Sequence, residues 1–255
     1  MPRTEERFPT LDPRRWTAAY LPAWSSTHAA RATWDLVPDG LRLRVPDEHP
    51  LWCPDRHTDP LLKVSGVQSG TWSGPVGSTR GQQPFRDGLT VTEAQVEQRG
   101  LVWRYGRVEV TCRAVVGPSS MFSAWVIGFE DEPERCGELC LVEVFGDTAA
   151  PDGTVAVGTG VHAFRDPALV EEFSADRVAL DVAEPHAYAV EWTPHGTTFE
   201  LDGRTLRRSA QSPRYPMQLE LAVFDFPGRG PRPQVPELVV ESVVVESDEL
   251  VDGAA

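Results

Sequence analysis

Short runs of alternating apolar and polar residues, separated by glycine and proline, recur along the whole chain. The 255 residues include 21 glycines and 23 prolines, and typical runs are Leu41–Val45, Gly106–Ala114 and Ala187–Trp192. Side chains alternate between the two faces of a strand, so such runs predict strands. The sequence shows neither an amphipathic pattern of three helical turns nor a repeat period. We therefore expect an all-β chain of sandwich or barrel type.

The strand-like character extends over residues 8–247 without an intervening linker. We expect one domain over this range, with short tails at residues 1–7 and 248–255. The turn Asp202-Gly203 lies between two alternating runs and predicts a tight hairpin.

One long stretch, residues 46–88, is rich in glycine, proline and serine and predicts loops with only a few short strands. We expect these loops to lie over one face of the domain. The aromatic residues Trp52, Trp72 and Phe85 could roof a cleft there, or they could anchor the loops to the core.

The net charge of −14 limits the partners of the chain. Nucleic-acid binding needs clustered positive charge, so we expect no nucleic-acid partner. A strongly anionic polysaccharide would be repelled, whereas a neutral glycan would not. Read as it stands, the sequence has neither the apolar segment of a secretory signal nor eighteen consecutive apolar residues. We expect a cytoplasmic monomer without a membrane partner, or a secreted protein if the sequence omits a signal.

The chain has four cysteines, Cys53, Cys112, Cys136 and Cys140, without a CxxC pair or a histidine at zinc-finger spacing. Neither a structural zinc site nor a disulfide framework is expected from this pattern. Cys112 lies in a strand pattern and reads as a small core residue. We expect no metal and no cofactor.

Two carboxylates, Glu138 and Glu143, lie five residues apart in an otherwise apolar strand-like run. Strict alternation would place them on opposite faces of the strand, and one extra residue, a β-bulge, would bring them onto the same face. Two carboxylates about 5–5.5 Å apart on one sheet face are what a retaining glycosidase needs. The alternative is an acidic strand edge that faces solvent.

Several segments in order resemble glycoside hydrolase family 16, the laminarinase and lichenase group with a concanavalin A-like jelly roll. Tyr105–Glu109 looks like the YGRFE segment of that family, and Glu138–Glu143 looks like its E-x-D-x-x-E signature in the bulged form. Further similar segments are Ser123–Gly128, His186–Pro194, the Asp202-Gly203 turn and Tyr215–Met217. The resemblance covers most of the chain. It implies a β-sandwich jelly roll of two packed antiparallel sheets with a concave substrate-binding face.

The resemblance also implies a reaction. Glu138 matches the nucleophile of the family and Glu143 matches its general acid/base. The chain would then hydrolyse O-glycosidic bonds of a neutral β-linked glucan or related glycan with retention. For this role Glu143 has to hold a proton near neutral pH, so we expect burial and the charge of Glu138 to raise its pKa.

Two residues depart from the family pattern. Cys140 stands where the signature has an aspartate that assists the nucleophile, and a thiol is normally neutral and a weak hydrogen-bond donor. Met121 occupies the place of a cleft tryptophan. By alternation Met121 shares a face with Trp125, which remains as a sugar platform.

Three further residues are candidates for contact with sugar. Trp125 and Met121 are joined by His162, which matches a histidine of the family, by Trp103 before the YGR segment, and by Phe145 two residues beyond Glu143. For His162 and Trp103 the alternatives are loop packing and core packing.

Three alternatives to a hydrolase of glycan polymers follow from these observations. The departures at Cys140 and Met121 also fit a carbohydrate-binding, lectin-like protein on the same fold. A transglycosylase would use the same intermediate. An intracellular enzyme acting on imported oligosaccharides would need a short, closed cleft, which the stretch 46–88 could supply.

Overall fold

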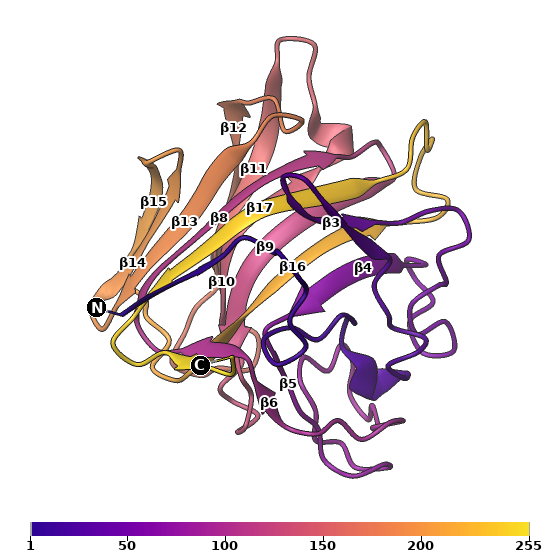
Figure 1. Ribbon diagram of the computed structural model, residues 1–255, viewed down its shortest axis with the longest axis vertical. Helices are drawn as coiled ribbons and strands as arrows, with labels where there is room; N and C mark the ends of the chain where they lie inside the picture. The colour runs from indigo at the N-terminus through magenta and orange to yellow at the C-terminus, as the bar shows by residue number, and fades with distance from the viewer. Residues whose placement is uncertain (1, 255) are drawn as a thin grey trace.

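Two large antiparallel sheets packed face to face form the body of the molecule (Figure 1). The computed structural model describes residues 2–254. Within that range each sheet has eight strands. The strands of sheet A, in spatial order, are β15 (Arg204–Ser209), β14 (Gly196–Leu201), β13 (His186–Thr193), β8 (Gly106–Val115), β17 (Glu237–Glu246), β3 (Gly40–Arg44) and β2 (Trp34–Val37), with β1 (Arg3–Glu6) beside β17.

Sheet B holds the strand of the two carboxylates near its centre. Its order is β12 (Glu172–Ala179), β11 (Thr154–His162), β10 (Glu138–Phe145), β9 (Ser120–Gly128), β16 (Met217–Asp225), β7 (Leu101–Trp103) and β18 (Val251–Asp252), with β4 (Lys63–Gln68) beside β16. A separate pair consists of β5 (Gly70–Thr71) and β6 (Gln98–Arg99), and two short 3₁₀ turns are η1 (Pro22–Trp24) and η2 (Gly146–Thr148). This is the β-sandwich jelly roll that the sequence predicts.

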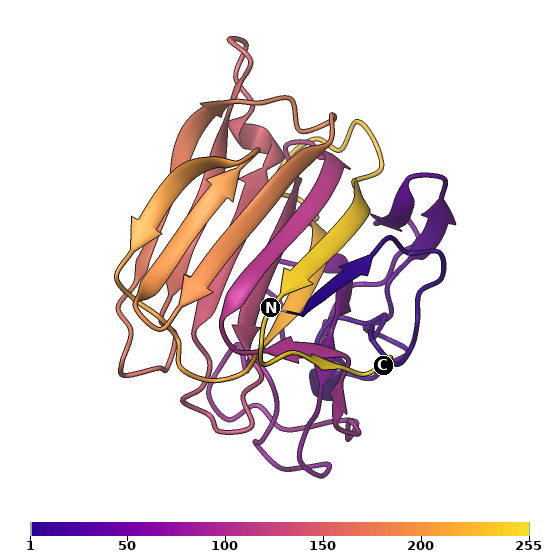
Figure 2. The same cartoon turned by 60° about the vertical axis from the view of Figure 1, so that its left-hand side comes forward.

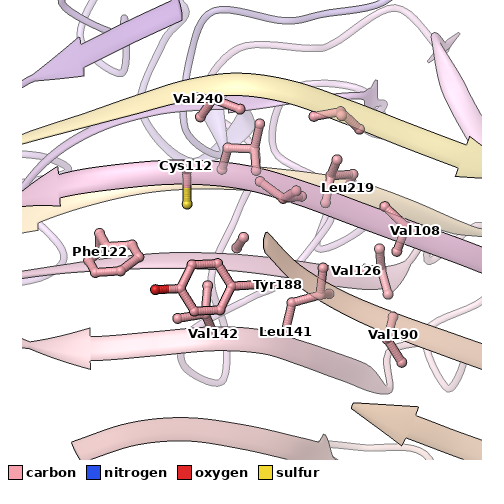
Figure 3. Close-up of a cluster of buried hydrophobic side chains, with 14 of the residues drawn as sticks. Val108, Cys112, Phe122, Val126, Leu141, Val142, Tyr188, Val190, Leu219 and Val240 are labelled. Atoms are coloured by element: carbon pink, nitrogen blue, oxygen red, sulfur yellow. The ribbon is translucent and has the colours of Figure 1, made fainter. Parts of the chain in front are cut away.

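The main core lies between the two sheets. Strand β8 alternates strictly, and its residues Val108, Val110, Cys112 and Ala114 are all buried. Across the core from Cys112, Phe122 of β9 meets Tyr188 of β13 with ring centroids 6.3 Å apart (Figure 3). Cys112 is therefore a core residue, as predicted.

Strands β9 and β16 differ from β8 because all of their residues are buried. One face of these strands packs into the main core. The other face is covered by a second cluster of apolar residues, which includes Trp24, Trp52 and Leu62 from the N-terminal third of the chain. In Figure 1 these indigo and purple segments gather beside β4, β5 and β6. The stretch 46–88 thus lies over one face of sheet B, as expected, and supplies strands β4 and β5.

The hairpin between β14 and β15 turns at Asp202-Gly203, as predicted. Both residues have positive φ, 50° and 73°, which is the backbone of a type I′ turn and matches the twist of the flanking strands.

The two ends of the described chain depart from the expected tails. Residues 3–6 form β1, which pairs with β17 (Figure 2), and residues 251–252 form β18, which pairs with β7. The strand-forming part is therefore longer than residues 8–247 at both ends, because backbone pairing there needs no apolar alternation. Within residues 2–254 there is no helix of the length and hydropathy that a membrane crossing requires.

Candidate active site

The predicted bulge is present in β10. Cys140 pairs with Gly160 of β11 while Glu143 pairs with Gly158, so three steps along β10 match two along β11. The pairing with β9 shifts at the same place, between Cys140 and Val142. One extra residue in a strand returns the following side chains to the original face. Glu138 and Glu143 therefore point the same way.

Both carboxylates line one cavity of about 280 Å³. The cavity lies on the face of sheet B that is turned away from sheet A, because the intervening Leu139, Leu141 and Val142 are in the main core. Across the strand pair, Glu138 is opposite Ile127 and Glu143 is opposite Ser123. Two carboxylates, an alcohol and apolar walls therefore converge in one space, as a small-molecule site requires.

Burial and neighbouring charge raise the pKa of both carboxylates. The side chain of Glu138 is 13% exposed; its burial raises its pKa well above the usual value, and the charges of Glu143 and Glu220 raise it further. Burial also raises the pKa of Glu143, and the nearby His162 partly offsets that effect. Burial raises the pKa of Glu143 as expected, but the charge of Glu138 does not contribute to that shift. The pKa of Glu138, matched to the nucleophile, is raised even more clearly.

Cys140 lies between the two carboxylates and is 1% exposed. Burial raises the pKa of its thiol well above the usual value, and the charges of Glu138 and Glu143 act in the same direction. Its Sγ is 4.0 Å from the carbonyl oxygen of Gly158, a distance that suits a weak S–H hydrogen bond. Cys140 is thus a neutral, buried thiol rather than an exposed nucleophile.

Met121 and Trp125 line the same cavity and are 6% and 5% exposed. They form part of its floor, where Tyr20 packs edge-on to Trp125 with ring centroids 6.4 Å apart. Of the loop aromatics, Trp52 and Phe85 line the cavity. Trp72 instead anchors its loop, because its indole nitrogen donates to the Phe129 carbonyl at 2.7 Å.

His162 lies beside the pair without a hydrogen bond to it. Its Nε2 is 3.9 Å from Glu138 Oε1, and its Nδ1 is 2.6 Å from Glu171 Oε1. Its ring stacks on Phe173 at 4.4 Å. Glu171 therefore orients this histidine beside the carboxylate pair.

Phe145 follows Glu143 on the same face but stands outside the cavity lining. Its ring stacks on Phe226, with centroids 6.0 Å apart, and the Arg229 guanidinium lies 4.5 Å from the Phe145 centroid. Any sugar contact of Phe145 would therefore lie beyond the cavity itself.

The expected sugar contact of Trp103 is wrong. Trp103 is 1% exposed and belongs to the main core between the two sheets. Trp103 therefore faces the core between the sheets and not the cavity. Core packing, the alternative that the sequence left open, is what the structure has.

Two buried glutamates of this region were missed. Glu220 of β16 is 1% exposed, and Glu130, in the loop after β9, is 2% exposed and lines the cavity. Burial raises the pKa of Glu220 to about 8 and that of Glu130 to about 7. Glu220 could have been found, because Gln218, Glu220 and Ala222 alternate with leucines as the residues of β10 do. Glu130 has no comparable signal in the sequence.

Metal ligation finds no support in the residues that the structure describes. Over positions 2–254, no three or more histidine, cysteine, aspartate or glutamate side chains group closely enough to hold a metal ion. The acidic residues near the cavity are instead tied to amides and an arginine. Gln218 and Gln83 donate to Glu220, and Arg165 donates to Glu130 at 2.7 Å.

No family model matches the chain, and no curated protein sequence matches it. Solved structures do match. An endo-β-galactosidase from Clostridium perfringens that releases GlcNAcα1-4Gal superimposes with a TM-score of 0.80 at 23% identity, over 95% of this chain and 61% of that chain. The chain thus spans 61% of the length of that enzyme.

Two glucanases match along nearly their whole length. The laminarinase catalytic domain from Thermotoga maritima has a TM-score of 0.60 at 14% identity, over 96% of this chain and 97% of that one. The β-glucanase from Bacillus licheniformis has a TM-score of 0.60 at 12% identity, over 96% and 98%. At these identities the likeness establishes the fold, a jelly roll of the glycoside hydrolase family 16 type.

Proposed function

We propose that the protein is a retaining glycoside hydrolase that cleaves O-glycosidic bonds of a neutral β-linked glycan. One observation carries the proposal: Glu138 and Glu143 lie on the same face of one bulged strand and line the same cavity. The order and spacing of these residues match the signature of glycoside hydrolase family 16, to which we assign the chain. The fold shared with the galactosidase and the glucanases supports this assignment.

In the proposed mechanism Glu138 attacks the anomeric carbon while Glu143 protonates the leaving oxygen. Glu143 then removes a proton from water, and the resulting hydroxide releases the sugar from Glu138 with net retention. The reaction needs Glu138 ionised and Glu143 protonated, so the pair has to hold one proton. Burial raises the pKa of both groups, which favours holding that proton toward neutral pH. Such a pair titrates as one unit rather than as two separate residues.

The charge of the cavity favours a neutral substrate. Four glutamates lie in or directly behind it, and the one arginine that lines it, Arg165, is already paired with Glu130. A glycan that carries carboxylates or sulfates would be repelled by the ionised member of the Glu138–Glu143 pair. The names of the similar enzymes include β-galactoside and β-glucan substrates, so we propose β-linked glucose or galactose units as the first to test.

The central test replaces Glu138 with glutamine, which keeps the size and polarity of the side chain but removes the nucleophile. We expect the wild type to release sugar from at least one β-glucan or β-galactan, and Glu138→Gln to lose at least about a thousandfold in kcat. Glu191→Gln, an exposed position on β13, is the control and should keep full activity. Proton NMR of the first product should show the β-anomer. An α-anomer, or undiminished activity of Glu138→Gln, would contradict the mechanism.

A second candidate function is glycan binding without cleavage. It is favoured by the raised pKa of Glu138, since a protonated nucleophile cannot attack, and by the neutral thiol at Cys140. Calorimetry together with product analysis decides between these functions. Saturable binding of an oligosaccharide by a wild type that forms no product favours the binding protein. Transfer of sugar to an added acceptor favours a transglycosylase.

A further inference from the structure

Part of the site face of sheet B, over strands β9, β16 and β4, is covered by the protein itself. We call the buried apolar residues of segments 19–30, 52–62 and 89–91 the cover. They pack directly on β9, β16 and β4 and form one cluster with Trp125, Ala222 and Val64 of those strands. The large cover residues Trp24 and Trp52 are 1% and 3% exposed. A glycan crossing these three strands would have to displace a packed apolar layer.

The cover is fixed by polar contacts as well as by packing. The indole nitrogen of Trp24 donates to the Gln82 carbonyl at 2.7 Å, and that of Trp52 donates to the Tyr20 carbonyl at 2.9 Å. Tyr20 also packs edge-on against Phe224 of β16, with ring centroids 5.6 Å apart. Buried hydrogen bonds of this kind are costly to break. The cover is therefore a permanent wall of the cavity.

A second closure lies at the Glu138 end of β10, where two loops meet on the buried carboxylate of Glu130. Arg165, in the loop after β11, donates to Glu130 Oε1 at 2.7 Å, and the backbone N–H of Gln83 donates to Glu130 Oε2. The side chain of Gln83 continues to Glu220 on the floor. Glu130 thus joins the loop at residues 81–85 to the loop at residues 163–166 and narrows the cavity beside Phe164.

The remaining side of the cavity is the one toward β11. The residues of β11 beside Cys140 and Glu143 are Gly160 and Gly158, which have no side chain, and the ring of Phe173 from β12 lies over Gly158. Phe164 stands at the rim here. It lines the cavity, is 58% exposed and has a φ of 46°, a left-handed conformation that is unfavourable for phenylalanine. An exposed aromatic ring held in such a conformation at a cavity rim suits stacking on a sugar.

The size of the cavity agrees with a pocket that is walled by the cover and the Glu130 contacts and has its rim at Phe164. Its volume of about 280 Å³ is near the lower end of small-molecule pockets, which span about 300–1,000 Å³. A volume of this size suits a short saccharide.

We propose that this cavity is a terminal pocket, in which one end of the glycan is enclosed by the cover and the Glu130 contacts while the rest leaves past Phe164. This proposal rests on the proposed glycoside hydrolase function and specifies its substrate: the end of a neutral glycan. Cleavage then releases one short saccharide at a time. A groove open at both ends, which admits internal bonds of a polymer, is the alternative.

Binding to end-capped oligosaccharides tests the proposal. The probes are β-1,3-glucan and β-galactan hexasaccharides with free ends, with an aromatic amine at the reducing end, or with a benzylidene acetal at the non-reducing end. Calorimetry with Glu138→Gln avoids turnover. We expect at least one cap to weaken binding about tenfold or more. Equal binding of free and capped forms would overturn the terminal pocket alone, whereas binding of none of the probes would overturn the proposed function as well.

Product analysis with the wild type gives a second measurement. On a hexasaccharide labelled at the reducing end, we expect one short saccharide to be removed in each event, so that the first minutes give a single new labelled species. Phe164→Ala should raise KM for the hexasaccharide at least about threefold and change kcat little, because Phe164 contacts sugar away from the reacting bond. A random mixture of fragments at the first time point would contradict the proposal.

Discussion

Cys140 changes the charge of the candidate site more than its shape. An aspartate at this buried position would place a third acid between Glu138 and Glu143, whereas the thiol, whose pKa is raised by burial, stays neutral. The carboxylate pair therefore lacks one repulsive neighbour on β10. Glu220 partly takes its place, since its charge is among the causes that raise the pKa of Glu138. The acid that influences Glu138 thus comes from another strand of the same face.

Glu220 itself has consequences for stability. Burial raises its pKa from the ordinary 4.5 to about 8, against the hydrogen bonds from Gln83 and Gln218 that favour the charged form. A carboxyl whose pKa is higher in the folded state holds its proton more tightly there. The contribution of Glu220 to the free energy of unfolding is fully present below pH 4.5 and is lost as the pH rises through about 8. Its other oxygen, Oε2, has no hydrogen-bond partner.

Glu220→Gln should therefore stabilise the protein at alkaline pH. Glutamine mimics the protonated acid and can accept the hydrogen bonds from Gln83 and Gln218. We expect the free energy of unfolding at pH 8.5 to exceed that of the wild type by on the order of 2–4 kcal/mol, and the two proteins to agree near pH 4.5. Denaturant unfolding at a series of pH values measures this. Glu184→Gln, at an exposed loop position, should show no such pH-dependent gain; a constant difference for Glu220→Gln would contradict the account.

At the scale of one element, the bulge of β10 could be predicted because the same few residues have to meet two requirements. Glu138 and Glu143 have to lie on one face, and the apolar residues between and beside them have to reach the core. Leu139, Leu141, Val142 and Val144 have to reach the core, and they all do. Two consecutive core residues, Leu141 and Val142, are incompatible with strict alternation. That Met121 and Trp125 share a face could also be predicted, since residues four apart in a strand point the same way, and the resemblance placed that face on the cleft side. Trp103 could not be assigned, because in a strand buried on both faces the pattern does not tell one face from the other.

The bulge can be tested by deleting one residue. Without Val142, the order Glu138-Leu139-Cys140-Leu141-Glu143 alternates regularly and keeps both carboxylates on the cavity face. We expect this deletion to fold, to lose about 1–3 kcal/mol of unfolding free energy for one buried valine, and to keep glycan binding. Denaturant unfolding and calorimetry measure the two effects.

Deletion of Leu139 is the matched comparison. It also shortens β10 by one residue, but it turns Glu138 toward the apolar core, where an unpaired carboxylate is very costly. We expect this variant not to fold. Equal behaviour of the two deletions would show that strand length, rather than the face of Glu138, decides the outcome.

At the scale of the whole molecule, the alternating runs and the Asp202-Gly203 turn predicted an all-β sandwich or barrel. The choice of two packed sheets came from the resemblance to glycoside hydrolase family 16. The position of the stretch 46–88 over one face could be predicted from its composition, whereas the Glu130 contacts could not be predicted. They join residues 47 and 35 positions apart, Gln83 with Glu130 and Glu130 with Arg165, through polar side chains in loops. Neither the periodicity of strands nor the spacing of a motif encodes such contacts. The shape of the cavity, and with it the substrate range, therefore depends on the loops.

The two sheets are also joined at their edges, through Arg15. Its guanidinium binds Asp252 of β18 in sheet B with two hydrogen bonds of 2.7 and 2.6 Å, and it lies 3.3 Å from Glu6 of β1 in sheet A. The side chains of Arg15, Glu6 and Asp252 are 20%, 5% and 10% exposed. Burial alone would raise the pKa of Asp252, but the hydrogen bonds from Arg15 and from the Ala254 N–H outweigh burial and lower it.

Arg15→Ala should therefore destabilise the whole sandwich and not only its ends. It leaves two largely buried carboxylates without their cation, for which we expect a loss of about 2–4 kcal/mol of unfolding free energy at pH 7. Because the pKa of Asp252 is lowered by folding, this contribution is present above pH 3.8 and is lost as the pH falls below it. Thermal unfolding should show one transition, moved to lower temperature at pH 7 and close to that of the wild type near pH 3. Arg14→Ala is the control, since Arg14 is 63% exposed and contacts Asp12 at the surface; an equal loss in both variants would contradict a specific link between the sheets.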